Sequence, residues 1–295
     1  MPGGARIWLM AARPRTLPAA VAPVLVGTAL AGYIGVFHWL RFVAALLGAV
    51  LIQVGTNLSN DYSDARRGAD TEDRLGPVRV TAGGLVPPRQ VLIATYLTFG
   101  LAVLVGLYLV IVAGWQLLLV GIASILAGVA YTGGPKPYGY EGLGEVFVFL
   151  FFGVVAVAGS YFVEVRALSW EAFALSVPVG LLAAAILVVN NIRDIDSDRR
   201  AAKRTSAVRL GRERTRTVFG VVVYLAFLLT PITWLFGPLQ AWVMLPWLTL
   251  GLAVPLVRLV RTHADGPSLN RALARTGMLQ LAFCALLSAG LLLSG

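Results

Sequence analysis

The chain has 295 residues, of which 58% are hydrophobic and only 13% are charged. This composition excludes an ordinary soluble globular domain, in which roughly half of the residues are apolar and about a quarter are charged, and it indicates an integral membrane protein. The formal net charge of +10 arises from basic residues scattered through short loops, which favours contact with anionic lipid or an anionic substrate over binding of nucleic acid.

Apolar stretches of about 20 residues, the length that a helix needs to cross the hydrocarbon core, recur along the whole chain. They predict an all-α, polytopic membrane protein with about nine transmembrane helices. The first stretch is full-length and runs on into further membrane segments, so we expect it to be retained and not cleaved as a signal peptide. The candidate spans are residues 16–35, 42–64, 91–113, 115–132, 144–163, 171–192, 217–236, 240–258 and 272–293.

Basic residues are distributed unevenly between the two ends of these spans. With a cytoplasmic N-terminus, all but Arg41 and Arg166 of the 24 basic residues fall on the cytoplasmic side. The same side holds all but Glu164 and Glu171 of the 14 acidic residues. Because Lys and Arg are retained in cytoplasmic loops, we expect a multi-pass membrane protein with its N-terminus and its active site on the cytoplasmic side. The predominance of arginine over lysine suggests a bacterial source, and hence a plasma membrane location.

The second predicted span ends in a polar stripe, within NLSNDYSDARRGAD at residues 57–70. Residues three or four apart share one helix face. Several carboxylates gathered at a membrane edge repel one another unless cations lie among them. A plainer alternative is that these acids cap the helix end in water, paired with the arginines that follow them. The stripe consists of Gln53, Asn57, Asn60, Asp61 and Asp64.

The sixth predicted span ends in a similar stripe, within NNIRDIDSDRRAAKR at residues 190–204. Helical spacing aligns Asn190, Asp194 and Asp198, with Asn191 beside them. The same polar stripe recurs four helices apart. This recurrence suggests an internal duplication inside a single domain that covers residues 1–295. The two predicted repeats are residues 16–132 and 144–258, followed by a final helix.

Carboxylate and amide oxygens without His or Cys are the ligands of a hard divalent ion such as Mg²⁺, which also shares substrate phosphates. The two histidines, His38 and His263, are distant in sequence from both stripes. Cys284 is the only cysteine, and we expect it to be a small buried residue. The sequence therefore predicts a magnesium site and argues against zinc or haem.

The two acidic motifs, on the second and sixth of about nine helices, resemble those of the UbiA-type intramembrane aromatic prenyltransferases over nearly the whole chain. This resemblance implies a single helical bundle around a central cavity that opens to the cytoplasmic side. It also implies that Mg²⁺ held by both motifs binds a polyprenyl diphosphate, whose prenyl group is transferred to an aromatic acceptor.

Four longer stretches resemble the branch of this family that acts on 1,4-dihydroxy-2-naphthoate in menaquinone synthesis. The resemblance implies transfer of a polyprenyl group to that acceptor, with loss of CO₂ and pyrophosphate, to give demethylmenaquinone. In the first motif the third acid expected of the superfamily would fall on Gly68, and Asp70 follows two residues later, as in the naphthoate branch. The stretches are RPRTLPAAVAPVLVGT (13–28), NDYSDARRGADTEDRLGPVRVTAGGL (60–85), YTGGPKPYGYEGLGEVFVFLFFG (131–153) and NNIRDIDSDRRAAKRTSAVRLG (190–211).

The resemblance and the charge that develops when an allylic diphosphate ionises together suggest roles for individual residues. Expected metal ligands are Asn57, Asp61, Asp64, Asp194 and Asp198. The same four aspartates, with Lys136 and Glu145, are the expected catalytic residues. Aromatic rings that shield the allylic cation are expected among Tyr131, Tyr138, Tyr140, Phe147 and Tyr161. Expected substrate-binding residues are Arg15, Asn60, Asp70, Arg79, Tyr131, Tyr138, Tyr161, Asn190, Asn191, Arg193 and Lys203.

Two other functions fit part of the pattern. A related prenyltransferase could use a different acceptor, such as 4-hydroxybenzoate or a chlorophyllide, with the same diphosphate chemistry. A transporter would need ionisable groups at mid-membrane depth, whereas the outer halves of these spans are almost wholly apolar. The lipid bilayer and the two substrates are the expected partners, and the sequence indicates no obligate protein partner.

Overall fold

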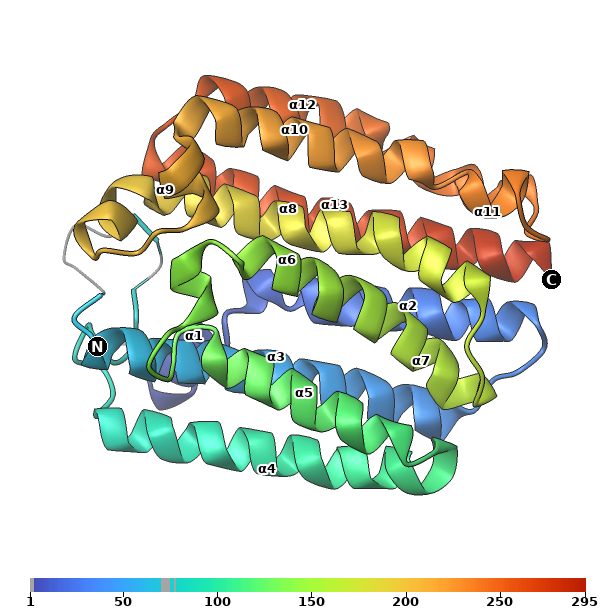
Figure 1. Ribbon diagram of the computed structural model, residues 1–295, viewed down its shortest axis with the longest axis horizontal. Coiled ribbons are helices and arrows are strands. Elements are labelled where there is room, and N and C mark those ends of the chain that lie inside the picture. The colour runs from blue at the N-terminus through green and yellow to red at the C-terminus, as the bar shows by residue number, and fades with distance from the viewer. Residues whose placement is uncertain (1–2, 70–74, 77) are drawn as a thin grey trace.

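The computed structural model describes residues 3–69, 75–76 and 78–295, and within these residues the chain forms helices and no strand. The long helices lie side by side along the longest axis of a single bundle (Figure 1). The elements are α1 (Gly4–Ala12), η1 (Pro14–Thr16), α2 (Pro18–Tyr33), α3 (Trp39–Arg66), α4 (Pro88–Ala113), α5 (Gln116–Ala130), η2 (Tyr138–Glu141), α6 (Gly144–Phe149), η3 (Leu150–Val155), α7 (Ala156–Val165), α8 (Trp170–Arg200), α9 (Ser206–Leu210), α10 (Arg212–Leu229), α11 (Ile232–Leu235), η4 (Ala241–Thr249), α12 (Leu250–Thr262) and α13 (Gly266–Ser294).

The multi-pass, all-helical architecture predicted from the sequence is confirmed, although the count of nine spans is not. Each predicted span corresponds to one helix or to consecutive helical segments. In the described part of the chain, seven helices are long and apolar enough to cross a membrane, and the pair formed by residues 4–16 and 18–33, bent by 55°, brings the number to eight. The predicted fourth span is α5, which has only 15 residues, or about 22 Å of helix.

Both polar motifs lie at the same end of the bundle, where α3 and α8 finish and α4, α10 and α13 begin (Figure 1). We refer to it as the charged end. At the opposite end, the buried carboxylate of Glu164 accepts hydrogen bonds from the backbone N–H of His38 at 2.7 Å and lies 3.1 Å from its ring Nδ1. Arg41 donates to the carbonyl oxygens of Val163 and Glu164. These few polar groups tie the start of α3 to the end of α7.

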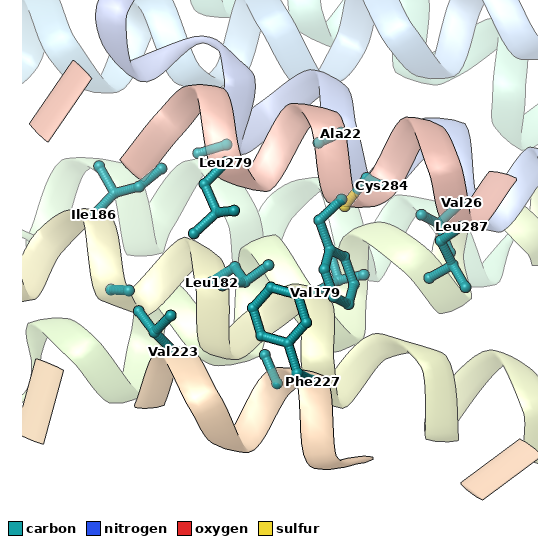
Figure 2. Packing of buried hydrophobic residues seen from close by; sticks show 14 of the residues in the cluster. Ala22, Val26, Val179, Leu182, Ile186, Val223, Phe227, Leu279, Cys284 and Leu287 are labelled. Atoms are coloured by element: carbon teal, nitrogen blue, oxygen red, sulfur yellow. The ribbon is translucent and has the colours of Figure 1, made fainter. Parts of the chain in front are cut away.

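The main core is built around α8, which is buried over most of its length. Figure 2 shows side chains of α2, α8, α10 and α13 meeting there, among them Leu182, Phe227 and Leu279. Cys284 is fully buried in this core, as expected from the sequence. Because lipid is as apolar as these side chains, close packing of the helices contributes more to their association than exclusion of water. The internal repeat proposed from the sequence stays a prediction.

The π-helical segment η3 packs against α8 through two glycines. A Cβ atom on Gly153 would lie 2.5 Å from the Cα atom of Gly180 and 2.9 Å from the carbonyl oxygen of Ser176. Small residues of this kind allow the backbones of membrane helices to approach closely. By contrast, a Cβ atom on Gly159, on the adjoining helix α7, would have no neighbour within 4 Å.

Replacing Gly153 by alanine should therefore destabilise the bundle. We expect Gly153→Ala to lower the free energy of unfolding by about 1–3 kcal/mol because the backbones must separate. The matched variant Gly159→Ala should leave it unchanged or raise it by about 0.5–1 kcal/mol, since alanine favours the helix. Thermal denaturation in detergent measures both, and equal melting temperatures for the two variants would contradict this account of the α8 contact.

Candidate active site

A cavity of about 440 Å³ extends from the charged end into the bundle. Its polar wall combines Asp64 of α3 with Asp194 and Asp198 of α8, so carboxylates of both motifs face one space. Deeper in the bundle its lining is apolar and comes mainly from α3, α4, α5 and the α6–α7 segment. The arrangement suits a ligand with a charged head and a long apolar tail.

Asp64 is a buried carboxylate held by three partners. Its side chain is 2% exposed and lies 3.0 Å from Nη2 of Arg79 and 3.3 Å from Nζ of Lys203. The hydroxyl of Tyr140 donates to its Oδ1 atom at 2.6 Å. The ammonium group of Lys203 also lies 4.6 Å from the centre of the Tyr140 ring. Residues that follow α3, α5 and α8 therefore meet at this single carboxylate.

Asp61 occupies a different position from Asp64, although the two residues are one turn apart. Its carboxylate accepts hydrogen bonds from the backbone N–H groups of Val80 and Thr81, at 3.1 and 2.9 Å. It is 1% exposed and is not among the residues that line the cavity. In the structure Asp61 holds the connection between α3 and α4 on the helix end through charge-assisted bonds.

Asn57 and Gln53 hold the bend between α1 and α2. Asn57 donates from Nδ2 to the carbonyl oxygen of Ala12 at 2.9 Å, and Gln53 donates to Oγ1 of Thr16 at 3.1 Å. Between these two anchors Arg13 adopts a left-handed backbone conformation, with φ of 54°. The side chain of Arg13 lines the cavity.

Sequence reasoning chose Arg15 and missed Arg13. Arg15 is exposed and lies outside the cavity lining. A signal for Arg13 was present, because the residue before Pro14 is disfavoured in a helix and marks the bend.

The second motif contains a buried ion pair between neighbouring residues. Arg193 is 2% exposed, and it donates from Nε to Oδ1 of Asp194 at 2.7 Å and from Nη2 to Oδ2 at 2.6 Å. Its Nη2 atom also donates to Oδ1 of Asn190 at 2.8 Å. Such a bidentate contact fixes the orientation of the carboxylate. Asp194 thus faces the cavity with a cation behind it.

Glu145 joins three helical segments beside the cavity. Its Oε1 atom accepts hydrogen bonds from Nδ2 of Asn191 at 2.8 Å and from the hydroxyl of Ser206. Glu145 is not among the lining residues, whereas Asn191 is. Lys136 is exposed and also lies outside the lining.

An aromatic wall runs from the charged end into the cavity. The ring centres of Tyr131 and Tyr138 lie 5.4 Å apart, those of Tyr138 and Phe147 lie 4.0 Å apart, and those of Phe147 and Phe151 lie 6.2 Å apart. All four side chains line the cavity. Tyr161, expected at the site from the sequence, is instead buried in the main core.

Burial raises the pKa of the Tyr131 phenol well above its usual value, and the neighbouring carboxylate of Glu145 raises it further. Tyr138 and, more weakly, Asp198 and Asp64 act in the same direction. Burial also raises the pKa of Tyr138. Both phenols therefore keep their protons at neutral pH, and each can donate a hydrogen bond.

The chemistry of the lining fits a magnesium ion shared with a bound phosphate group. Within the described ranges, no three or more His, Cys, Asp or Glu side chains are close enough together to hold a metal ion. Mg²⁺ commonly binds one or two carboxylates and completes its shell with water and substrate phosphates. Asp64 on one wall and Asp194 and Asp198 on the other provide two such partial sites.

The expected site residues thus fall into three groups. Asp70 lies outside the described residues. The residues that the structure places away from the cavity lining are Arg15, Asp61, Lys136, Glu145, Tyr161 and Arg193. Those that it brings to the lining are Asn57, Asn60, Asp64, Arg79, Tyr131, Tyr138, Asn190, Asn191, Asp194, Asp198 and Lys203.

The family profile and the bacterial relatives that match this chain all bear the names of prenyltransferases. The profile of the UbiA prenyltransferase family matches residues 20–292. The 1,4-dihydroxy-2-naphthoate octaprenyltransferase of Mycobacterium tuberculosis is 41% identical, over 98% of this chain and 97% of that protein. The protein of the same name from Escherichia coli is 38% identical, over 91% of this chain and 89% of that protein.

A solved structure has the same fold. The UbiA homolog from Archaeoglobus fulgidus, bound to DMAPP and Mg²⁺, superposes with a TM-score of 0.70. The alignment covers 96% of this chain and 98% of that chain, at 15% sequence identity.

The position of Asp61 predicts a local effect on backbone exchange. Asp61→Asn removes the charge from two hydrogen bonds, and bonds to a charged group contribute about 1.5–3 kcal/mol each. We therefore expect the amides of Val80 and Thr81 to exchange with deuterium at least about tenfold faster. Asp196→Asn, which alters an exposed carboxylate paired with Arg212, serves as the control. Unchanged exchange in Asp61→Asn would refute the anchoring role.

The raised pKa of Tyr131 predicts that this phenol resists ionisation in the folded protein. In a spectrophotometric titration up to about pH 11, above the ordinary tyrosine pKa of about 10, Tyr131→Phe should match the parent protein. After denaturation the same variant should show one ionising tyrosine fewer. A loss of one ionising group in the folded protein would contradict the assignment.

Proposed function

The chain belongs to the UbiA prenyltransferase family, and we propose that it transfers a polyprenyl group from a polyprenyl diphosphate to 1,4-dihydroxy-2-naphthoate. Pyrophosphate and CO₂ leave, and demethylmenaquinone is formed for menaquinone biosynthesis. The observation that supports this function most strongly is the meeting of Asp64, Asp194 and Asp198 at the head of one long apolar cavity. The names and the near full-length similarity of the two bacterial relatives support the choice of acceptor.

The shape of the cavity suits both parts of the donor. On α3 its lining follows one helix face from Asp64 to Ala45, a distance of about 28 Å at about 1.5 Å per residue. Along this path the lining is rich in small residues, including Gly48, Gly106 and Gly121. A diphosphate at the charged end would therefore place its prenyl tail along α3 and α5.

The residues at the charged end would favour departure of the diphosphate. Breaking the allylic C–O bond puts negative charge on the leaving group and positive charge on the prenyl carbon. Arg79 and Lys203, both beside Asp64, are placed to attract the developing anion. Asp64, Asp194 and Asp198 would hold Mg²⁺, which would supply positive charge to neutralise the oxygens of the leaving diphosphate.

The aromatic wall would protect the developing cation from water. Cation–π attraction in a desolvated site contributes about 2 kcal/mol, and Tyr131, Tyr138 and Phe147 present three rings beside the polar wall. The protonated phenol of Tyr131 would also donate a hydrogen bond to an oxygen of the naphthoate. Asn191, held by Glu145, offers a second polar contact.

The same proposal assigns an orientation in the membrane. The charged end carries both acidic motifs, whereas Arg41, Glu164 and Arg166 lie at the opposite end. Because basic residues are retained in the cytoplasm, we place the charged end, the N-terminus and the active site on the cytoplasmic side of a bacterial plasma membrane.

A direct test supplies purified protein in detergent with farnesyl or longer polyprenyl diphosphates, Mg²⁺ and one acceptor at a time. We expect prenylated product with 1,4-dihydroxy-2-naphthoate and none with 4-hydroxybenzoate, and we expect EDTA to abolish the reaction. Asp64→Asn and Asp198→Asn should each lower turnover by at least about 100-fold, since each removes charge that stabilises the leaving group.

The matched control is Glu213→Gln, which alters an exposed acid of α10 paired with Arg216. Its turnover should equal that of the parent protein. Equal turnover of 4-hydroxybenzoate would refute the assigned acceptor, and full activity of Asp64→Asn would refute the assigned site.

A further inference from the structure

The connection between α3 and α4 is attached to the bundle at two places. On one side Asp61 holds the backbone of Val80 and Thr81, and Arg79 pairs with Asp64. On the other side the carbonyl oxygen of Leu75 accepts a hydrogen bond from Nδ2 of Asn270, in the first turns of α13, at 2.8 Å. The described part of this connection therefore bridges the first acidic motif and α13.

Leu75 also packs against the first turn of α13. A Cβ atom added to Gly266 would lie 3.0 Å from the Cβ atom of Leu75 and 3.2 Å from its Cδ2 atom. This contact is independent of the Asn270 side chain. It offers a way to disturb the connection without changing Asn270.

The other end of the Asn270 amide reaches the second motif. Its Oδ1 atom accepts a hydrogen bond from Nη1 of Arg193 at 2.8 Å. Arg193 uses its Nε and Nη2 atoms for Asp194, at 2.7 and 2.6 Å. A side-chain amide carries its donor and its acceptor on separate atoms, so this one residue links Leu75 to the Arg193–Asp194 pair.

We propose that Asn270 is a positioning residue that joins the two acidic motifs and holds Asp194 in the orientation that the proposed prenyl transfer requires. Asn270 is not among the residues that line the cavity, so it acts through Arg193. Its hydrogen bonds described here go to Arg193 and Leu75, neither of which is an expected metal ligand. The proposal rests on the function given above, which makes Asp194 part of the diphosphate site.

The physical reason lies in the burial of Arg193. This guanidinium is 2% exposed, and a buried N–H group without an acceptor is strongly disfavoured. If the acceptor on Asn270 is removed, Nη1 must find another partner, and the plane of the guanidinium turns with it. Both contacts to Asp194 depend on that plane, so the carboxylate loses its fixed orientation. Outer residues that orient a ligand commonly change metal affinity or activity by about 10–100-fold.

The principal variant is Asn270→Ala, with Arg271→Gln as the matched control. Arg271 is the next residue on α13, is exposed, and contacts only Ser268 among the hydrogen bonds described for it. Gly266→Val is the second comparison, because it displaces Leu75 while leaving the amide of Asn270 in place. The isosteric variant Asn270→Asp replaces Asn270→Ala if the alanine protein does not accumulate, since its carboxylate competes with Asp194 for Arg193 and cannot donate to Leu75.

The first measurement needs neither metal nor substrate. Hydrogen–deuterium exchange of residues 78–86 should become at least about tenfold faster in Asn270→Ala and in Gly266→Val, because each releases one attachment of the connection. Arg271→Gln should exchange like the parent protein. Exchange in Asn270→Ala equal to that of the control would overturn the proposal.

The second measurement is the Mg²⁺ dependence of prenyl transfer. We expect Asn270→Ala to raise the Mg²⁺ concentration for half-maximal activity by about tenfold or more and to leave the KM for the naphthoate unchanged. Gly266→Val should keep the Mg²⁺ dependence of the parent, because it retains the contact of Asn270 with Arg193. An equal rise in both variants would overturn the role assigned to Arg193. Absence of prenyl transfer by the parent protein would refute the proposed function, while the exchange measurement would still test the link made by Asn270.

Discussion

The arrangement of the charged end depends on the buried carboxylate of Asp64. A carboxylate removed from water is tolerated only when cations and hydrogen-bond donors surround it, and Asp64 receives Arg79, Lys203 and Tyr140. These partners follow three different helices, α3, α8 and α5. The backbone N–H of Arg204 also donates to the carbonyl oxygen of Tyr140 at 2.8 Å, which joins the connection after α8 directly to the one after α5. One desolvated charge thus determines how the connections over the cavity are placed.

Away from the charged end, a different constraint shapes the bundle. In lipid, close packing contributes more to the association of helices than exclusion of water, and the helices approach through small residues such as Gly153 and Gly180. α8 packs tightly on several sides, whereas α5 buries only Gly128. The cavity lies on this loosely packed side, between α5 and the α6–α7 segment. Close packing on one side and open space on the other separate the stable core from the space for the substrate tail.

Helical periodicity was sufficient to predict the two polar stripes and the spans that carry them. It identified Asp64, Asp194 and Asp198, because their spacing places each on the face of a long regular helix. It could not identify the partners of Asp61 or Asn57, which are backbone groups of Thr81, in an irregular segment, and of Ala12, at the end of the short helix α1. The conformation of such segments depends on tertiary contacts that leave no period in the sequence.

The positions of Tyr161 and Asn270 in the fold cannot be predicted from the neighbouring sequence. Tyr161 lies among mostly apolar residues of α7, where nothing in the sequence distinguishes a core-facing ring from a cavity-facing one. Asn270 is far in sequence from both motifs, and only the fold brings it to Arg193. The length of α5 was overestimated because its apolar run continues through Trp115 and Tyr131, which flank the helix in the structure.

The central claim is that the walls carrying Asp64 and Asp198 bind one diphosphate between them. Equilibrium binding of an unreactive farnesyl thiodiphosphate in the presence of Mg²⁺ tests it most directly. If the two walls share the ligand, Asp64→Asn and Asp198→Asn will each weaken binding by about tenfold or more, and the double variant will deviate from the sum of the two effects, as expected for residues coupled through one ligand. Unchanged affinity in either single variant would contradict the claim.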